Sequence, residues 1–376
     1  MIPMPATPEE AARQQQEIMA AISQVDPFLT PRRITTYGIH NTGKTYQGIE
    51  LFRALMRSRV SRGLPPGRLL RIAGEASGNS AIQPYVDAGM ALNIELTRVT
   101  DPSKYTAELF LQQLASGRFW VKDDKTKTGV RGYLIGEEFS MLWIEGIDGF
   151  ADLIAQHLAA GARPVTDPTS PGAPVALSWT SRAPDENGEL TIEHNSAIMN
   201  RDHVGKAQDA AVLGITGVLQ QSIPLIYLTS HERTAVVKDT SMGTQGDTLD
   251  RMAGPLLFKN AGTPKILPKL DMLLHHEIMP DGTRRVYFEN HPDPGNPRVS
   301  WVSTSRLAPN LLNQFKLWCT GGQPFFNLMP SAPGAPSVGI PWFLQAAEYF
   351  QRLEIAQIHE ENARLLAIYQ SKKDPS

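Results

Sequence analysis

The sequence predicts an α/β protein with a mainly parallel sheet, and three observations lead to that prediction. Strand-like and helix-like runs alternate from about residue 33 to residue 308, which is typical of parallel strands joined by helices. A glycine-rich segment, residues 38–45, directly follows the first strand-like run. The turn signal Pro280-Asp281-Gly282 separates two later strand-like runs and indicates an antiparallel hairpin at one edge of the sheet.

The first third of the chain is expected to contribute a helix and then three strand–helix pairs. Thr7 is a good N-cap and Pro8 suits the first helical position, so we expect a helix over about residues 8–23. The strands expected after it are 33–37, 68–73 and 92–99, and the helices that follow them are 44–60, 80–90 and 103–115.

The rest of the core is expected to complete the sheet. The strand-like runs are 133–135, 141–144, 224–229, 272–278 and 285–289, and the helical runs are 149–160 and 207–220. Two segments rich in glycine and polar residues, 161–188 and 234–254, are expected to be loops. Loops of this length inside a compact domain are usually functional or mobile.

The composition favours one long core with an appendage at each end. The chain has 376 residues, of which 41% are hydrophobic, so a sizeable core is expected and global disorder is not. We divide the chain into an N-terminal helical appendage (1–30), a core (31–308), and a proline-rich arm with a C-terminal helix (309–376). Residues 317–347 hold five prolines and no charged side chain, which favours an extended arm packed on a neighbouring surface.

Charge and cysteine content exclude several classes of protein. With 36 basic and 38 acidic side chains the net charge is −2, which argues against a globally basic nucleic-acid binder but permits a local basic groove. The single cysteine, Cys319, excludes an internal disulfide and a cysteine-type zinc site. The chain lacks a run of about 18 apolar residues, and its N-terminus is polar and acidic. We therefore expect no membrane span and a cytoplasmic location.

Residues 38–45 read Gly-Ile-His-Asn-Thr-Gly-Lys-Thr, which fits the phosphate-binding pattern G-x-x-x-x-G-K-[ST]. The two glycines allow the backbone to curl so that its N–H groups form an anion-binding nest, and the N-terminus of the next helix adds positive charge. Lys44 can reach the β- and γ-phosphates, and the Thr45 hydroxyl can bind Mg²⁺. The nucleotide-binding residues expected here are Gly38, Ile39, His40, Asn41, Thr42, Gly43, Lys44 and Thr45.

A site of this kind needs carboxylates near the phosphates. An acid at the tip of a neighbouring strand holds Mg²⁺ through its water shell, and Glu145, which ends the apolar run from Met141, is the first candidate, with Asp148 as the fallback. A second acid orients or deprotonates the attacking water, and Glu75 follows a strand at the sheet edge where ligands bind. The alternatives are that Glu145 only caps the next helix and that Glu75 is a solvated loop residue.

Polar side chains also follow the apolar strand at residues 225–228. Thr229, Ser230 and His231 are placed to sense the γ-phosphate, although a lone histidine at a strand end is as often structural. The run His275-His276-Glu277 has the residue types of a metal site, but neighbours on a strand point to opposite faces, so we do not expect one.

The order of these parts resembles the RecA-type ATPase core, and in detail the bacteriophage RecA-like proteins of recombination and single-strand annealing. The resemblance covers about residues 31–308. The segments that carry it are GIHNTGKT at 38–45, AGEASGN at 73–79, MLWIEGI at 141–147, LIYLTSHE at 225–232 and GPLLFKNAGTPKILPKLDMLLHHE at 254–277. The first segment is specific for nucleoside triphosphates, and the others support the resemblance mainly by their order.

The resemblance implies roles for several residues. Glu75 matches the catalytic glutamate, acting beside Lys44, and Glu145 matches the Mg²⁺-associated acid, which is more often aspartate in the family. Arg306 stands where the family often has a basic pair that acts on a neighbour's nucleotide. Residues 234–254 match the loop that contacts single-stranded DNA. The basic residues in and beside that loop are Arg233, Lys238 and Arg251.

The function that the resemblance implies is ATP binding and hydrolysis with Mg²⁺ by a homo-oligomer that acts on single-stranded DNA in recombination, annealing or replication. For a phage protein the location would be the host cytoplasm. One alternative is a helicase-like or regulatory ATPase whose main partner is a protein, bound through residues 317–370. Another is a structural protein that binds nucleotide without hydrolysing it.

Overall fold

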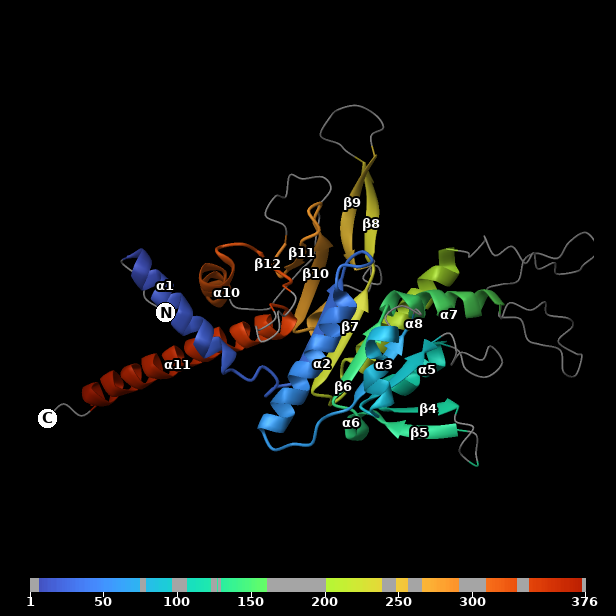
Figure 1. Ribbon diagram of the computed structural model, residues 1–376, viewed down its shortest axis with the longest axis horizontal. Coiled ribbons are helices and arrows are strands. Elements are labelled where there is room, and N and C mark those ends of the chain that lie inside the picture. Colours follow the sequence, from blue (N-terminus) through green and yellow to red (C-terminus); the bar gives the residue numbers. More distant parts are fainter. Residues whose placement is uncertain are drawn as a thin grey trace, which may run out of the picture. The chain divides into compact units, whose positions relative to one another are not determined.

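The computed structural model divides into two compact units. Figure 1 labels their helices and strands. The first unit comprises Met1–Gly67, Glu232–Gly254 and Asp271–Ser376, and the second comprises Arg68–His231 and Pro255–Leu270. The residues that the structure describes are 7–74, 79–96, 107–122, 127, 130–160, 201–238, 248–255, 266–290, 309–329 and 338–373.

Four strands of the first unit lie in the order β12-β11-β10-β1. Strand β1 (Arg32–Tyr37) pairs in parallel with β10 (Met272–Ile278), whereas β11 (Arg284–Tyr287) is antiparallel to both β10 and β12 (Phe325–Asn327). The turn between β10 and β11 is closed by a hydrogen bond from Met279 N to Thr283 O of 2.8 Å. The predicted antiparallel edge hairpin is therefore confirmed.

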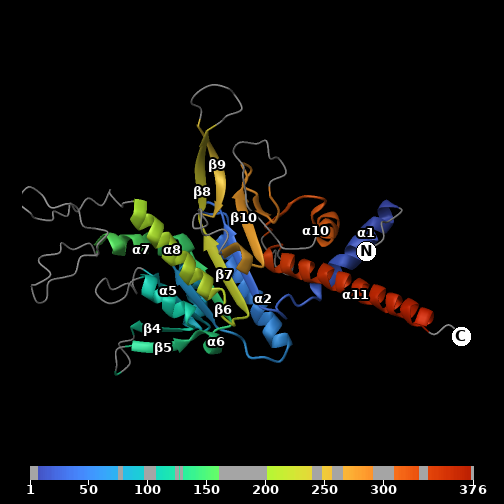
Figure 2. The ribbon, with the colours of Figure 1, turned by 180° about the vertical axis from the view of Figure 1, so that it is seen from behind.

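The helices of the first unit are α1 (Pro8–Ser23), α2 (Lys44–Ser61), α10 (Pro309–Phe315) and the long α11 (Ile340–Lys373). A short π-helical segment, Lys316–Thr320, follows α10. The Thr7 hydroxyl caps α1 by accepting a hydrogen bond from Glu10 N at 3.1 Å. Helix α1 packs against α11, as both ribbon views show (Figures 1 and 2).

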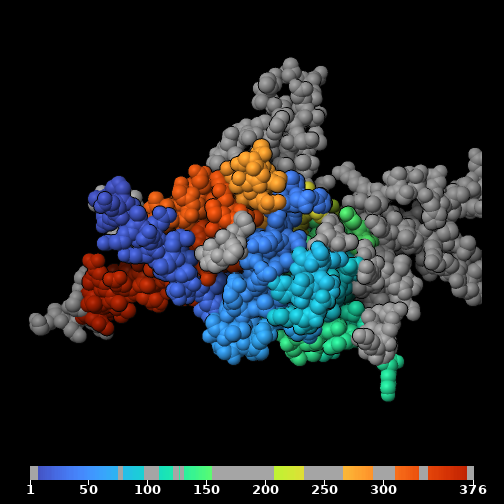
Figure 3. Space-filling view, in the orientation of Figure 1, coloured from blue at the N-terminus to red at the C-terminus, as the bar shows by residue number. Residues whose placement is uncertain are grey.

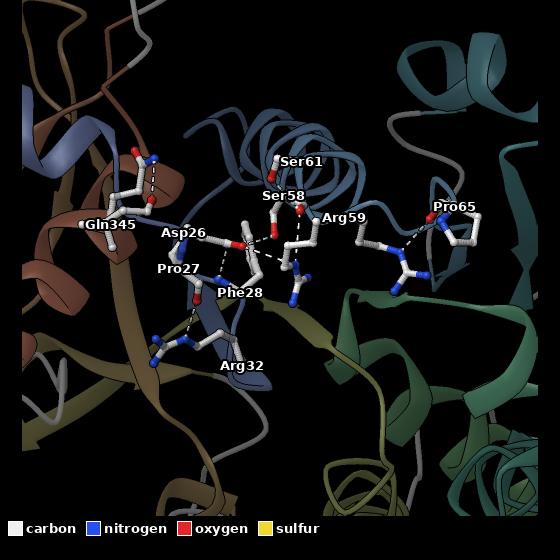
Figure 4. Close-up of polar contacts among 11 residues, drawn as sticks. Asp26, Pro27, Phe28, Arg32, Ser58, Arg59, Ser61, Pro65 and Gln345 are labelled. Carbon is white, nitrogen blue, oxygen red and sulfur yellow. Dashed lines mark hydrogen bonds and ion pairs between the residues drawn. The ribbon is translucent and has the colours of Figure 1, made fainter.

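The connection from α1 to β1 is fastened to α2 by one carboxylate (Figure 4). Asp26 accepts hydrogen bonds from Phe28 N at 2.9 Å and from the Ser58 hydroxyl at 2.8 Å, and its Oδ2 lies 3.4 Å from Arg62 Nε. Because Ser58 and Arg62 lie at the end of α2, these bonds fix that end of the helix to the chain that enters β1.

Residues 317–347, which have no charged side chain, differ in their described part from the extended arm that their prolines suggested. Its described residues form the π-helical segment, strand β12 and the start of α11, and Phe326 and Phe343 are buried. The two rings lie 5.4 Å apart, and Phe343 stacks 5.2 Å from Phe288. Burial of these rings outweighs the proline signal, and Pro341 is tolerated because it lies in the first turn of α11.

Residues 234–254, expected to be a loop, are strand at both ends. Strands β8 (Glu232–Lys238) and β9 (Thr248–Pro255) pair with each other in a two-stranded sheet. The β-branched residues of β8 favour this conformation, and Gly254, one of the glycines that suggested a loop, lies inside β9. The loop expected at 161–188 lies outside the described residues.

Four strands of the second unit lie in the order β7-β6-β2-β3 and are all parallel. They are β2 (Leu69–Ala73), β3 (Ala91–Glu95), β6 (Met141–Glu145) and β7 (Leu225–Ser230). Every residue of β2, β6 and β7 is buried, as expected for parallel strands covered on both faces. Ala73 pairs with Glu145 and Ile144 with Leu228, so the carboxyl ends of these three strands meet at one edge.

The helices of the second unit include α3 (Asn79–Asp87), α5 (Ala107–Ala115), α6 (Ile135–Glu138), α7 (Ile147–Ala160) and α8 (Arg201–Val218). An antiparallel pair, β4 (Arg118–Lys122) with β5 (Val130–Leu134), and a 3₁₀ turn, Leu267–Lys269, complete it. Helices α5, α7 and α8 pack together (Figure 2). None of the helices in the described part of the chain has the length and hydropathy that a membrane span requires.

These strands and helices establish the predicted class, an α/β fold with mainly parallel strands and an antiparallel edge. Several predicted ends are displaced by a few residues: β5 begins at Val130 and α8 at Arg201, earlier than expected.

Candidate nucleotide-binding site

The loop at residues 38–45 joins β1 directly to α2, which begins at Lys44. Three of its residues have positive φ: Gly38 at 152°, Asn41 at 62° and Gly43 at 93°. Glycine adopts such angles without strain, and asparagine is among the residues that tolerate the left-handed region. The loop therefore curls tightly and leads into a helix N-terminus, whose first N–H groups lack partners within the helix.

Gly38 is required for a second reason besides its positive φ, which is the close approach of the neighbouring strand β10. A Cβ atom at this position would lie 2.2 Å from the main-chain oxygen of His276. The approach is this close because β1 and β10 are paired up to Tyr37 and His275, the residues just before these two. Only glycine fits where the chain leaves the sheet to form the loop.

The Lys44 side chain folds back over its own loop. Its ammonium group donates hydrogen bonds to the carbonyl oxygens of Gly38 and Ile39, both at 2.7 Å. The Thr42 hydroxyl also donates to Ile39 O, at 3.0 Å. The positive charge is thus held above the curled main chain, where an anion bound to the loop N–H groups would meet it.

His276 supports the loop from β10. The side chain is fully buried, and its Nδ1 lies 3.3 Å from the carbonyl oxygen of Thr42, so Nδ1 carries the proton of this contact. Burial, the nearby Lys44 charge and His275 lower the pKa of His276 to about 3, although the Thr42 contact acts in the opposite direction. The ring is therefore neutral at physiological pH.

Sequence reasoning did not identify this role of His276. The contact with Thr42 joins residues 234 positions apart, and it becomes visible only through the pairing of β1 with β10. Within the described residues, the Nε2 atom of His276 has no hydrogen-bond partner.

Two further side chains hold the loop and the helix that follows it. Arg284 of β11 donates from Nε to Asn41 O at 3.1 Å. Gln47, buried in the first turns of α2, accepts a hydrogen bond from Ile340 N at 2.7 Å, which ties α2 to the start of α11.

A buried pair lies beside the loop-bearing strands. His275 Nε2 is 3.0 Å from Glu232 Oε1, and both side chains are almost fully buried. The His275 ring also lies 4.6 Å from the Tyr37 ring. This pair connects the first residue of β8 to β10 within the first unit.

The second unit contains its own polar cluster, centred on Glu145. The fully buried Arg71 donates from Nε to Glu145 Oε2 at 2.8 Å, and its Nη2 bonds the same oxygen. Arg71 Nη1 donates to the side-chain oxygens of Asn79 and Asn93, each at 2.8 Å, and the guanidinium lies 5.1 Å from the Trp143 ring centroid. In this arrangement Glu145 is the counter-ion of a buried arginine.

Asp148, in the first turn of α7, is held by the end of β7. Its Oδ1 accepts hydrogen bonds from His231 N at 2.9 Å and the Ser230 hydroxyl at 3.2 Å, and Oδ2 lies 2.6 Å from His231 Nδ1. Burial acts to raise the pKa of Asp148, but the hydrogen bonds and charge of His231 outweigh it and lower the pKa. Asp148 therefore remains ionised and orients the His231 ring.

Thr229 joins the same edge by accepting a hydrogen bond from Gly146 N at 3.0 Å. Gly74, after β2, approaches so closely that a Cβ there would lie 2.8 Å from Gly146 O. The structure thus brings Glu145, Asp148 and residues 229–231 to the carboxyl edge of β6 and β7.

The remaining predicted residues are described in part or not at all. Glu75 and Arg306 lie outside the described residues. Arg233 and Lys238 fall in β8 and Arg251 in β9, but only the main chain is described there.

Comparisons with known proteins give little further information. No protein-family model and no curated protein matches the sequence. One similar solved structure is the crystal structure of the RadB recombinase, with 11% identity, a TM-score of 0.30, and coverage of 70% of this chain and 82% of that chain. A likeness this weak carries no argument about function, so the functional assignment depends on the residues and the geometry of the loop.

Proposed function

We propose that this protein is a RecA-like P-loop ATPase that binds ATP and Mg²⁺ at residues 38–45. The observation that carries the proposal is the conformation of this loop, which curls through Gly38, Asn41 and Gly43 directly into α2. The curled N–H groups and the helix N-terminus suit phosphate oxygens. Lys44 supplies the charge for the β- and γ-phosphates.

Mg²⁺, when bound, neutralises phosphate charge as the terminal phosphoryl group is transferred. The donor types present fit such an ion, because the Thr45 hydroxyl and carboxylates are hard oxygen ligands. Glu145 is the first candidate for the associated acid and Asp148 the second. The proposal keeps Glu75 as the residue that activates water and Arg306 as a contributor to a neighbour's site.

Nucleotide binding is tested with a fluorescent ATP analogue. Lys44→Ala should weaken binding by about 2–3 kcal/mol, roughly a hundredfold, because a charge-assisted contact to phosphate is lost. Arg57→Ala is the matched control, since Arg57 is an exposed cation of the same helix. Equal affinities for the two variants would contradict the proposal.

Hydrolysis is tested separately from binding. Glu75→Gln should bind the analogue normally and turn over ATP far more slowly. A wild-type chain that binds ATP but shows no turnover would favour the structural nucleotide-binding protein instead.

The proposed role of the ATPase is to act on single-stranded DNA in the recombination, annealing or replication of phage DNA. It would do so as a homo-oligomer in the host cytoplasm. The support is the order of motifs that resembles that family. Because the net charge is −2, DNA contacts would be local, at Arg233, Lys238 and Arg251. Binding to a labelled single strand should therefore fall with salt, but with a modest slope. No binding at low salt, with or without ATP, would contradict this activity.

The balanced charge also favours a second candidate, a helicase-like or regulatory ATPase whose main partner is a protein. The ATPase rate separates the two candidates. Stimulation by single-stranded DNA supports the first, whereas a rate that is indifferent to DNA supports the second.

A further inference from the structure

The C-terminal half of α11 carries a row of exposed apolar side chains. Every residue from 355 to 370 is exposed, and the dark red end of the helix lies at the surface in Figure 3. The large apolar members of the row are Ile355, Ile358, Leu365 and Tyr369, with exposures of 46%, 50%, 56% and 63%. Single exposed apolar side chains are ordinary, but several along one helix face indicate an interaction surface.

The spacing of this row is that of a helix that packs on another helix. The positions 355, 358, 362, 365 and 369 alternate steps of three and four, as the a and d positions of heptads do. The single polar member is Asn362, in the middle of the row. A lone asparagine at such a position typically fixes the register of a helix pair at some cost in stability.

This row continues, beyond the core, the side of α11 that packs on its own unit. The N-terminal part of the helix buries Phe343, Ala347 and Phe350. At 3.6 residues per turn, Leu365 lies five turns after the buried Ala347, and Ile358 lies five turns after the buried Ile340, so these side chains share one side of the helix. The row therefore extends an apolar side of α11 that the core of its own unit leaves uncovered from Ile355 to residue 370.

The charges along the same segment are separated by sign. Residues 354–361 contain Glu354, Glu360 and Glu361 and no lysine or arginine, whereas residues 362–373 contain Arg364, Lys372 and Lys373 and no acid. Two such segments side by side in parallel would place like charges together. An antiparallel pair would place the acidic part of each helix beside the basic part of the other.

We propose that residues 354–373 of α11 pair with the same segment of a second copy of this chain, in antiparallel orientation. A symmetric pair needs a surface that is complementary to itself, and the apolar row with its opposite charges on either side of Asn362 meets that requirement. The proposal does not depend on nucleotide binding, so it is tested without nucleotide.

The first test measures the mass of the full chain by light scattering over a dilution series. Leu365→Glu places a charge in the row and should weaken self-association at least about tenfold. Ala367→Glu is the matched control, because residue 367 is exposed on the opposite side of the helix. Circular dichroism checks that both variants fold. A monomeric wild type, or equal association of the two variants, would overturn the proposal.

The second test measures the relative orientation of the two α11 helices by cross-linking with a short bismaleimide. His359→Cys and Leu366→Cys lie on the same flank of the row, at similar distances on either side of Asn362. Antiparallel pairing should therefore give several-fold more cross-linked pair in a mixture of the two variants than in either alone. The native Cys319 should react slowly, because burial raises its pKa to about 12. Equal yields in all three samples would overturn the antiparallel pair.

Discussion

The two polar clusters of this protein are stabilised in different ways. In the loop at 38–45, Lys44 and His276 both contact main-chain carbonyl groups, and the shape of the loop comes from positive φ angles. At the carboxyl edge of β6 and β7, the cluster consists of side-chain pairs, Arg71 with Glu145 and Asp148 with His231. The loop is thus specified mainly by local backbone preferences, whereas the second cluster requires buried charges to be matched between distant residues.

The largest effect should follow from breaking the buried pair. Arg71→Met leaves the buried Glu145 side chain without its arginine, which should lower the free energy of unfolding by about 3–5 kcal/mol. Arg68→Met is the control, because Arg68 and its partner Glu138 are both about one-third exposed, 3.7 Å apart, and such pairs contribute about 0–1 kcal/mol. Urea titrations of both variants measure the difference.

A double substitution sharpens that result. Replacing Arg71 with Met and Glu145 with Leu removes both charges, so much of the lost stability should return. If the double variant is as unstable as Arg71→Met, the cost comes from lost packing of the arginine on Trp143 rather than from an unpaired charge.

The loop should be most sensitive at the glycine where the chain leaves the sheet. Gly38→Ala forces a methyl group against the main chain of His276, so we expect a loss of stability of more than about 2 kcal/mol together with weaker ATP binding. Gly63→Ala is the control. Its φ is 73° and a Cβ there would meet nothing within 4 Å, so its cost should stay near 1 kcal/mol. Equal losses of stability in the two variants would mean that a small shift of the main chain relieves the close contact between residue 38 and β10.

The same contrast explains what the sequence predicted. The loop, the hairpin and the start of α1 were predictable because each depends on adjacent residues: a glycine pattern, a Pro-Asp-Gly turn and the Thr7 cap. The polar edge at residues 229–231 was predicted by position alone. Its specific contact, Asp148 with His231, joins residues 83 positions apart and has no local signal.

Arg71 and strand β12 are two further features that the local sequence does not predict. An arginine inside the apolar run of β2 gives no hint of its partner, since Glu145 is 74 residues away. The three residues of β12 lie in a proline-rich segment, and they become a strand only because β11 offers them an open edge.

The Asp148 pair should have an intermediate effect. Asp148→Asn removes the charge that His231 contacts, so we expect a loss of about 1–3 kcal/mol at pH 7. Because the folded state lowers the pKa of Asp148, its contribution is present above the ordinary aspartate pKa and is lost as the pH falls through the lowered value. The difference between wild type and variant should therefore shrink below about pH 4, as urea titrations at several pH values would show.

The ATPase rate of Asp148→Asn tests which carboxylate is associated with Mg²⁺. If Glu145 is the associated acid, Glu145→Gln should slow turnover more than Asp148→Asn does. The opposite order would assign the role to Asp148.

The smallest effect should come from the histidine below the loop. His276→Leu removes the Nδ1 donor to Thr42, which should weaken ATP binding by about 1 kcal/mol, or roughly fivefold. His276→Asn retains an amide donor near the position of Nδ1 and should recover most of that affinity. Isothermal titration of both variants measures this, and equal losses would mean that ring packing rather than the hydrogen bond supports the loop.

Acid stability provides an independent test of His276. Its pKa is about 3 in the folded chain and about 6.5 when unfolded, so the unfolded state binds the extra proton between these values. The contribution of neutral His276 to the free energy of unfolding is fully present above about pH 6.5 and falls as the pH decreases toward 3. His276→Asn removes this proton uptake, so the variant should lose less stability than wild type between pH 7 and pH 5. Parallel losses in urea titrations would show that another group dominates acid unfolding, and that the loop is held without a buried neutral imidazole.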